Sequence, residues 1–219
     1  MSNWVSRLEL VATTAIAICA AFIAGLAVWN KVFGAAAMPA SRTRASLQSR
    51  EWNHMVGRGS LLQRGDSTAS TLVVFTDYEC PFCRRLEGVL DSVNVLKARR
   101  LNIVYRQFPL PQHKSAERAA LVAICATKKG AFSRVHRMLF TTAGQFDVQS
   151  QLKAAAASAL DPSFFPTCVA SHDTREKLDA DIALGKRLQL EGTPTVYVDG
   201  QLYSGPLTVA GISSRLRSR

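Results

Sequence analysis

The hydrophobic pattern separates an uncharged N-terminal stretch from a longer region in which short apolar runs alternate with amphipathic segments. Residues 10–29 carry no charge, and at about 1.5 Å per residue a helix of this length spans a bilayer core of about 30 Å. A cleavable signal usually has an apolar core of only about 7–15 residues. We therefore expect residues 1–9 to be a short N-terminal flank and residues 10–33 to be a transmembrane anchor or an uncleaved signal. The alanines at 35–37 leave cleavage open as an alternative.

A polar segment follows the apolar stretch. Residues 34–56 are rich in alanine, serine and arginine, which is typical of a tether. The tether could include a short helix over residues 47–56 that docks Trp52 on the folded domain. We place that domain at residues 57–219.

The first part of the domain has the pattern of a strand, a helix and a second strand. Residues 71–76 are a continuous apolar, β-branched run, which is typical of a buried strand. A helix is expected from Pro81, because proline lacks the N–H that the first helical turn would leave unpaired. Residues 101–108 predict the second strand. This order indicates a parallel, right-handed βαβ crossover.

A mainly helical insertion is expected at about residues 112–190. The periodicity predicts helices over 115–130, 132–140 and 149–159, a short one after Asp161-Pro162, and a last long one that ends near residue 190. Asp173 and Glu176 have the spacing of a capping box for the last helix.

The end of the chain has the pattern of a hairpin and a helix. Asp199-Gly200 between alternating residues is a strong signal for a two-residue turn, so strands are expected on both sides, up to residue 204. A final helix is expected over residues 207–216. The fold class is therefore α/β, with a βαβ unit, a helical insertion and a ββα unit.

Composition agrees with a globular domain and argues against a nucleic-acid-binding one. Apolar residues make up 47% of the chain and charged residues 20%. The net charge is +11, but the basic residues are scattered and no basic–aromatic interleaving occurs. A basic surface near anionic lipid headgroups is the simpler interpretation, and no nucleic-acid partner is expected.

The positive charges on the two sides of the predicted anchor bear on which side of the membrane the folded domain lies. Arg7 lies on the N-terminal side, whereas Lys31, Arg42 and Arg44 lie on the C-terminal side. Counting positive charges would keep the domain in the cytoplasm, although this rule is weak for long translocated domains. The compartment matters because it decides whether disulfides persist.

The candidate chemistry lies in Cys80-Pro81-Phe82-Cys83, directly after the first strand. A zinc site needs about four ligands, and neither a second cysteine pair nor a histidine pair follows at a suitable spacing, so no metal is expected. A static disulfide here would close a very short loop and add little stability. A redox-active pair explains more, because a thiolate at Cys80 would be stabilised by the start of the helix.

The second half of the chain contains a further motif, Gly192-Thr193-Pro194, immediately before the first strand of the predicted hairpin. Together, YECPFCRRL and GTPTVYVDG, separated by helices, resemble the DsbA-like branch of the thioredoxin superfamily, whose members are thiol:disulfide oxidoreductases of the bacterial cell envelope. The resemblance implies a thioredoxin-like fold for the domain. It further implies that Cys80 is the nucleophile, Cys83 the resolving thiol and Pro194 a cis-proline facing the dithiol. Thr193 would offer its backbone to an extended substrate, beside Pro81 and Phe82.

Two positions depart from the pattern of the branch. Many thioredoxin-like proteins place a buried acid six residues before the first cysteine, where this chain has Val74. Strongly oxidising members have a histidine where this chain has Phe82. We therefore expect a reduction potential between those of the strongest oxidants and the reductants.

Cys125 and Cys168 have two interpretations. They could be unrelated buried thiols. Similar proteins of the branch often carry cysteines in the two corresponding helices, which implies a structural disulfide between them. His113 is left outside the active site, because a lone histidine before a helix usually caps it or faces water.

The expected function is to introduce disulfides into envelope proteins through Cys80 and Cys83. The redox-active disulfide would serve without a cofactor, and protein thiols would be the clients. The resemblance implies a DsbB-type membrane partner and a single-pass inner-membrane protein with its catalytic domain in the periplasm. The alternatives are a reductase or isomerase of the same fold, and a non-catalytic, membrane-tethered peptide-binding module or chaperone.

Overall fold

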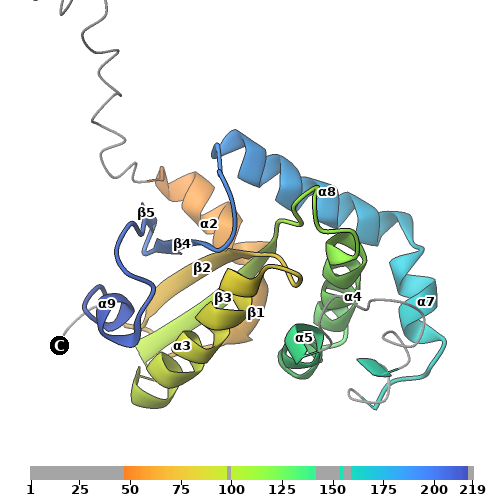
Figure 1. Cartoon of the computed structure of the whole chain (residues 1–219), viewed down its shortest axis with the longest axis horizontal. Helices are drawn as coiled ribbons and strands as arrows, with labels where there is room; N and C mark the ends of the chain where they lie inside the picture. The colour runs from red at the N-terminus through yellow and green to blue at the C-terminus, as the bar shows by residue number, and fades with distance from the viewer. Residues whose placement is uncertain (1–46, 98–99, 142–152, 155–158, 217–219) are drawn as a thin grey trace, which may run out of the picture. The chain divides into compact units, whose positions relative to one another are not determined.

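The computed structural model describes residues 47–97, 100–141, 153–154 and 159–216. A mixed five-stranded sheet with strand order β1-β3-β2-β4-β5 lies at its centre (Figure 1). The strands are β1 (Ser60–Gln63), β2 (Ser70–Thr76), β3 (Leu101–Gln107), β4 (Thr195–Val198) and β5 (Gln201–Leu202). Strands β2 and β3 are parallel, and each of the other neighbouring pairs is antiparallel.

Helices cover both faces of the sheet. They are α2 (Ser49–Gly57), α3 (Pro81–Lys97), α4 (Ala116–Lys128), α5 (Phe132–Thr141), α7 (Phe164–Val169), α8 (His172–Arg187) and α9 (Val209–Ser213). Alternate residues of a strand point to opposite faces. Val74 and Tyr105 therefore face a core shared with α3, α4, α5 and α9, whereas Phe75 and Val104 face α2 and α8. Burial on both faces explains why the central strands are continuously apolar.

The structure confirms a thioredoxin-like α/β fold with a helical insertion. Strand β2, helix α3 and strand β3 occur where the sequence predicts the βαβ unit. The predicted hairpin forms between β4 and β5. Asp199 and Gly200 have φ values of 47° and 83°, as a two-residue turn of type I′ requires.

Several local predictions were wrong. Strand β1 was not predicted, because it has only four residues and its burial does not alternate regularly. Helix α8 begins at His172 after the extended residue Ser171, so Asp173 and Glu176 do not form the predicted capping box. The last helix is also shorter than predicted, and Thr208 caps it by accepting a hydrogen bond from the backbone N–H of Gly211.

Some predictions lie outside the described residues. These are the anchor at 10–33 and most of the helix predicted at 149–159. Within the ranges that the structure describes, no helix is long and apolar enough to cross a membrane.

Helix α2 lies in the segment predicted as a tether, yet it is part of the same compact unit as the sheet. Met55 is fully buried in the core between α2 and the sheet. The backbone N–H of Leu47 donates to the carbonyl of Gly200 at 2.9 Å. The Trp52 ring lies over the same glycine, so α2 rests beside the turn between β4 and β5.

A buried ion pair joins the insertion to the sheet. Arg106 on β3 and Asp181 on α8 are 0% and 1% exposed, and Arg106 Nη2 lies 2.9 Å from Asp181 Oδ1. Asp181 also accepts the backbone N–H of Gln107 at 3.0 Å. This pairing fixes α8 against the strand that ends beside the candidate site.

The contact between Gly185 on α8 and the Phe108 ring gives a stability prediction. A Cβ atom at Gly185 would lie 2.4 Å from Phe108 Cε2. The ring is 9% exposed and packs edge-on against Phe75, so it cannot move aside freely. We expect Gly185→Ala to lower the free energy of unfolding in urea by about 1–2 kcal/mol, although alanine is the better helix former.

Gly88 provides the matched control. It lies within α3, and a Cβ there would meet nothing within 4 Å. Gly88→Ala should therefore raise the free energy of unfolding by up to about 1 kcal/mol. Equal stabilisation by both substitutions would show that the Phe108 contact imposes no constraint.

Candidate active site

The two cysteines of the candidate site lie where β2 passes into α3. Strand β2 ends at Thr76, and a turn follows in which the backbone N–H of Cys80 donates to the carbonyl of Asp77 at 3.2 Å. Pro81 is the first residue of α3, which places Cys80 at the start of the helix and Cys83 within its first turn. Cys80 is 4% exposed and Cys83 only 1%. Both residues are thus buried, Cys80 where the helix starts and Cys83 within its first turn.

The loop before β4 faces this pair. The Thr193–Pro194 peptide bond is cis, and the Cys80 thiol donates to the carbonyl of Thr193 at 3.3 Å. These residues are 113 positions apart in the chain, and the antiparallel pairing of β2 with β4 brings them together. The site residues predicted from the sequence therefore lie together where β2 ends and β4 begins. They are Cys80, Cys83, Thr193 and Pro194.

Cys83 is held as a neutral thiol. Burial raises its pKa to about 12, against the opposing effect of hydrogen bonding by Thr193 and by the Asp77 backbone. The Cys83 sulfur therefore becomes nucleophilic only when its buried thiol loses its proton. It would also take up a proton promptly on leaving a disulfide.

The surface beside Cys80 is apolar and cationic. Pro81 is exposed, and the Phe82 side chain is 59% exposed despite its size. The Arg85 guanidinium lies 4.9 Å from the centre of the Phe82 ring, a cation–π distance. An exposed ring next to a reactive sulfur can contact an apolar side chain of another polypeptide.

Asp77 organises the turn, and sequence reasoning missed it. Its buried carboxylate accepts the backbone N–H groups of Glu79 at 2.8 Å and Leu110 at 2.7 Å. His113 Nδ1 lies 2.8 Å from the same carboxylate. His113 thus contacts Asp77 and helps to hold the loop after β3 beside the turn. The available signal was an aspartate directly after a strand, a position that favours an Asx-turn.

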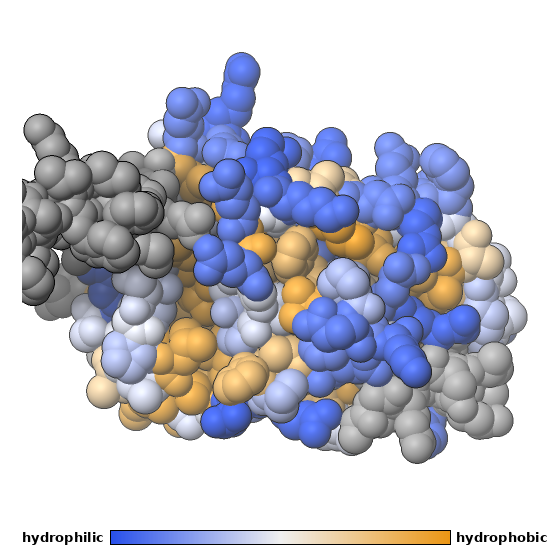
Figure 2. Space-filling model, turned by 45° about the horizontal axis from the view of Figure 1, so that its top comes forward, coloured by the Kyte–Doolittle hydropathy of each residue, from blue (hydrophilic) through white to orange (hydrophobic). Residues whose placement is uncertain are grey.

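A groove opens next to this loop. It has a volume of about 850 Å³ and lies between the loop after β3, α4, α8 and the residues before Gly192. Its apolar lining includes Phe108, Leu110 and Leu190, and Lys114 and Lys186 add positive charge. In Figure 2, apolar surface appears between hydrophilic side chains on the side of the molecule that α8 crosses.

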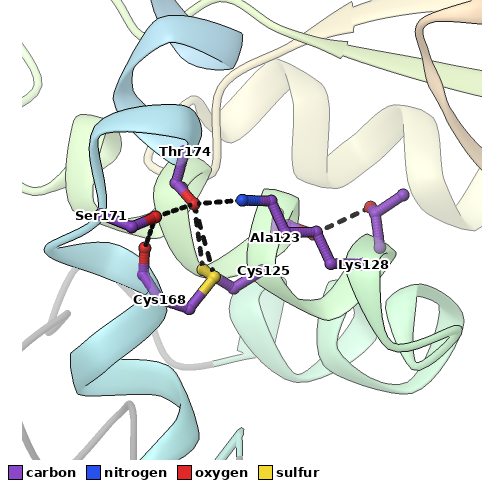
Figure 3. Close-up of a disulfide and its surroundings, with 7 residues drawn as sticks. Ala123, Cys125, Lys128, Cys168, Ser171 and Thr174 are labelled. Atoms are coloured by element: carbon purple, nitrogen blue, oxygen red, sulfur yellow. Dashed lines mark hydrogen bonds between the residues drawn. A yellow bond between two sulfur atoms is a disulfide. The ribbon is translucent and has the colours of Figure 1, made fainter.

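Cys125 and Cys168 form a disulfide between α4 and α7 (Figure 3). Their Cα atoms are 5.9 Å apart, and both residues are buried. Thr174, at the start of α8, places its hydroxyl 3.4 Å from Cys168 Sγ and accepts from Lys128 Nζ at 2.9 Å. The disulfide and its polar neighbours therefore join three helices of the insertion.

The candidate site offers no metal-binding cluster among the residues that the structure describes. The one group of three suitable ligands there is His172, Asp173 and Glu176, at the start of α8. All three are exposed, and exposed acidic groups commonly lie together without binding an ion.

The raised pKa of Cys83 predicts that alkylation of the reduced protein is selective for Cys80. At pH 7 Cys83 is far below its pKa of about 12, so very little of it is ionised. Iodoacetamide at pH 7 should therefore modify Cys80 and leave Cys83 intact, as peptide mass mapping would show. Cys83 labelling should rise about tenfold per pH unit above that, because only the thiolate reacts. Rapid labelling of Cys83 at pH 7 without denaturant would contradict the geometry.

Comparison with known proteins adds the family. Residues 59–217 match the family model described as thioredoxin. The chain is 30% identical over 151 residues to the Na(+)/H(+) antiporter NhaA 1 of Mycolicibacterium gilvum (strain PYR-GCK), which covers 68% of this chain and 24% of the antiporter. The chain thus spans about a quarter of the length of the curated relatives it matches.

Solved structures share the fold. A thioredoxin-like oxidoreductase from Silicibacter pomeroyi DSS-3 superposes with a TM-score of 0.64 at 22% identity, covering 74% of this chain and 94% of that one. The thiol-disulfide exchange protein α-DsbA2 from Wolbachia pipientis superposes with a TM-score of 0.63 at 16% identity, covering 77% and 97%. Because the family model spans most of the folded unit, the chain belongs to the thioredoxin family, and its helical insertion gives it the DsbA-like form of that fold.

Proposed function

We propose that the chain is a thiol:disulfide oxidoreductase that introduces disulfides into envelope proteins through a reversible Cys80–Cys83 disulfide. The observation that carries this proposal is the arrangement of the two sulfurs. Cys80 lies at the start of α3 and donates to the Thr193 carbonyl, whereas Cys83 lies within the first turn of the helix, where burial raises its pKa to about 12. Such an arrangement separates an attacked sulfur from a leaving sulfur.

The reaction transfers two electrons from a client to the protein. A client thiolate attacks Cys80 Sγ in the oxidised pair, a mixed disulfide forms, and Cys83 leaves and takes up one proton. A second client thiolate then attacks the client sulfur of the mixed disulfide, and Cys80 leaves as a thiolate. The client gains a disulfide and the pair becomes a dithiol. The redox-active disulfide does this chemistry without a separate cofactor.

The surroundings of Cys80 would position the client. An extended client segment would pair with the backbone at Thr193, and Phe82 would contact an apolar client side chain. The groove reaches Leu190 and Glu191, just before Gly192-Thr193, so a client chain that continues past the cysteine would enter it. These contacts would hold the client sulfur in line with Cys80.

We place the catalytic domain outside the cytoplasm, in the periplasm, held near the inner membrane by residues 10–33. The Cys125–Cys168 disulfide supports this compartment, because disulfides persist in oxidising environments. A DsbB-type membrane protein would reoxidise the pair. The matched antiporters are named for ion transport, and because this chain spans only about a quarter of their length, we propose no ion transport for it.

The reduction potential tests the direction of electron flow. The protein is equilibrated with glutathione redox buffers, and the oxidised fraction of Cys80 and Cys83 is read from the mass added by alkylation. A potential between about −120 and −180 mV, the range of DsbA and protein disulfide isomerase, would support a disulfide donor. A value near −270 mV, like that of thioredoxin, would overturn the donor function and leave a reductase.

A binding function alone would give a different result. If the chain acts as a chaperone through its groove, the double variant Cys80→Ser, Cys83→Ser should still prevent aggregation of an unfolded client. An oxidoreductase should lose client oxidation in the same variant. The two assays on one variant separate these classes.

A further inference from the structure

We infer that the groove between the loop after β3, α4 and α8 selects clients in which carboxylate and apolar side chains flank the reactive cysteine. The inference rests on the proposed function, because it names the class of polypeptide segment that the same site takes. It follows from the residues that line the groove and from the hydrogen bonds that join the groove to Cys80.

The groove is large enough for a ligand, and much of its lining is apolar. Its volume of about 850 Å³ lies within the range of about 300–1,000 Å³ that is typical of ligand pockets. Apolar side chains come from each surrounding element, with Leu110 in the loop after β3, Leu121 on α4 and Ile182 on α8. Such a lining favours the burial of apolar client side chains.

Positive charge predominates in the same lining. It contains four basic side chains and two acidic ones, which are Lys114, Arg118, Arg175, Lys186, Glu117 and Glu191. Arg175 Nη1 already pairs with Glu117 Oε1. Lys114, Arg118 and Lys186 are exposed and form no ion pair with any other residue that the structure describes. Glu191 offsets only part of their charge, so the groove attracts a segment that carries carboxylates.

The nearby helix does not account for two of these three cations. Lys114 lies two residues before α4, and Arg118 lies in the first turn of that helix. The N-terminal end of a helix carries partial positive charge, so the dipole of α4 disfavours a cation at both positions. Lys186 lies in the last turn of α8, where the dipole favours a cation, yet its side chain lines the same groove. An anionic partner in the groove would stabilise all three.

One wall of the groove is hydrogen-bonded to the turn that carries Cys80. Leu110 and His113 both line the groove. The Leu110 backbone N–H donates to Asp77 Oδ2 at 2.7 Å, and His113 Nδ1 lies 2.8 Å from the same oxygen. The other carboxylate oxygen of Asp77 accepts the backbone N–H of Glu79, and the Asp77 carbonyl accepts that of Cys80 at 3.2 Å. A segment that packs on Leu110 therefore lies against the support of the reactive turn.

The other end of the groove leads to the cis-proline loop. Leu190 lines the groove, and Thr193 follows it by three residues. Within this loop the Thr195 hydroxyl donates to the Gly192 carbonyl at 2.7 Å. The Thr193 carbonyl accepts the Cys80 thiol at 3.3 Å. A polypeptide that reaches Cys80 beside Thr193 can thus continue into the groove, which makes the groove a specificity site for the residues next to the client cysteine.

An acidic client fits the groove better than a segment of this chain or a second copy of it. Residues 34–46, which precede the described part of the chain, carry Arg42 and Arg44 and no acidic residue. The end of the chain is also basic, with arginines at 215, 217 and 219. A second copy would bring a net charge of +11 to a basic groove. Charge complementarity therefore favours another polypeptide, with carboxylates.

Activated peptides measure this selectivity whichever way electrons flow in the cell. Each peptide carries one cysteine as a mixed disulfide with pyridine-2-thiol, and two leucines alternate with two variable positions on one side of the cysteine. The variable positions are both aspartate, both asparagine or both lysine, on the N-terminal side in one series and on the C-terminal side in the other. The Cys80 thiolate of the reduced full chain attacks the peptide sulfur, a mixed disulfide forms, and pyridine-2-thiol leaves, which absorbance records.

In at least one series, the aspartate peptide should react at least about fivefold faster than the lysine peptide, because two ion pairs replace two repulsions. The asparagine peptide should lie between them, and the preference should shrink at high salt. Replacing two groove cations, in the double variant Lys114→Glu, Lys186→Glu, should lower the aspartate-to-lysine rate ratio at least about fivefold. Each ratio is measured on one protein sample, so a loss of folded protein cancels.

The double variant Arg64→Glu, Arg137→Glu is the matched control. It makes the same change in net charge at two exposed residues that do not line the groove. It should change the ratio by less than about twofold, because salt screens charges that lie far from the peptide. If the groove variant does not fold, Lys186→Gln against Arg64→Gln makes the same comparison.

Equal rates for the aspartate and lysine peptides in both series would overturn the selectivity. Equal effects of the groove variant and its control would overturn it as well, because general attraction by a basic protein would then explain the rates. Either failure is distinct from failure of the proposed function, which the glutathione equilibrium detects. No reaction with any peptide would overturn both, because Cys80 would then not exchange disulfides.

Discussion

Cys80→Ser is expected to abolish disulfide exchange, lowering the rate of client oxidation at least about 10³-fold, as loss of a nucleophile does in other enzymes. Serine is close to cysteine in size, so the Thr193 contact and the start of α3 should survive. A hydroxyl, however, cannot form the mixed disulfide that the reaction requires. Oxidative refolding of a reduced client protein, followed by the loss of free thiols, measures the effect.

Cys83→Ser gives the complementary result. Cys80 remains able to pair with a client sulfur, but the buried partner that would resolve the complex is gone. Client incubation should therefore accumulate a mixed disulfide at Cys80, visible as a reducible adduct on a non-reducing gel. Accumulation in Cys80→Ser instead would reverse the roles assigned to the two sulfurs.

The sequence predicts the parts of the fold and site that depend on short segments. Strand β2, helix α3 and the turn at Asp199-Gly200 are encoded by continuous apolar runs, a helix-starting proline and turn residues. The dithiol is also a feature of one short segment, because Cys80 and Cys83 are only three positions apart at the start of α3. Its relation to Pro194 followed from a family resemblance and not from the spacing.

Other parts depend on pairing between distant segments, which no local pattern reveals. Asp77 contacts Leu110 and His113 only because the loop after β3 returns to the end of β2. His136 likewise lies within hydrogen-bonding distance of Tyr78 and Glu87, which are 58 and 49 positions away in the chain. His136 looks like any residue of an amphipathic helix until the packing of α5 is known. The helical insertion thus supplies a polar group that the βαβ unit lacks.

Replacing both Cys125 and Cys168 with alanine is expected to lower the free energy of unfolding by about 4 kcal/mol. The disulfide links residues 43 positions apart, and the chain-entropy model gives about 4 kcal/mol for a loop of that length. The loss should destabilise α4, α7 and α8 together, because the bond joins α4 to α7 beside Thr174 of α8. Urea unfolding followed by circular dichroism, compared with the disulfide-bonded protein, measures the change.

The same double variant tests whether the second disulfide is structural and separate from catalysis. It lies among helices of the insertion and has no bond to Cys80 or Cys83 in the described residues. We therefore expect the glutathione equilibrium of the dithiol to be unchanged at a temperature where the variant stays folded. A loss of stability below about 1 kcal/mol would show that the bond does little to restrict the unfolded chain. A shifted dithiol equilibrium would instead show that the insertion tunes the reactive pair, because α5, which supplies His136, packs against α4, which holds Cys125.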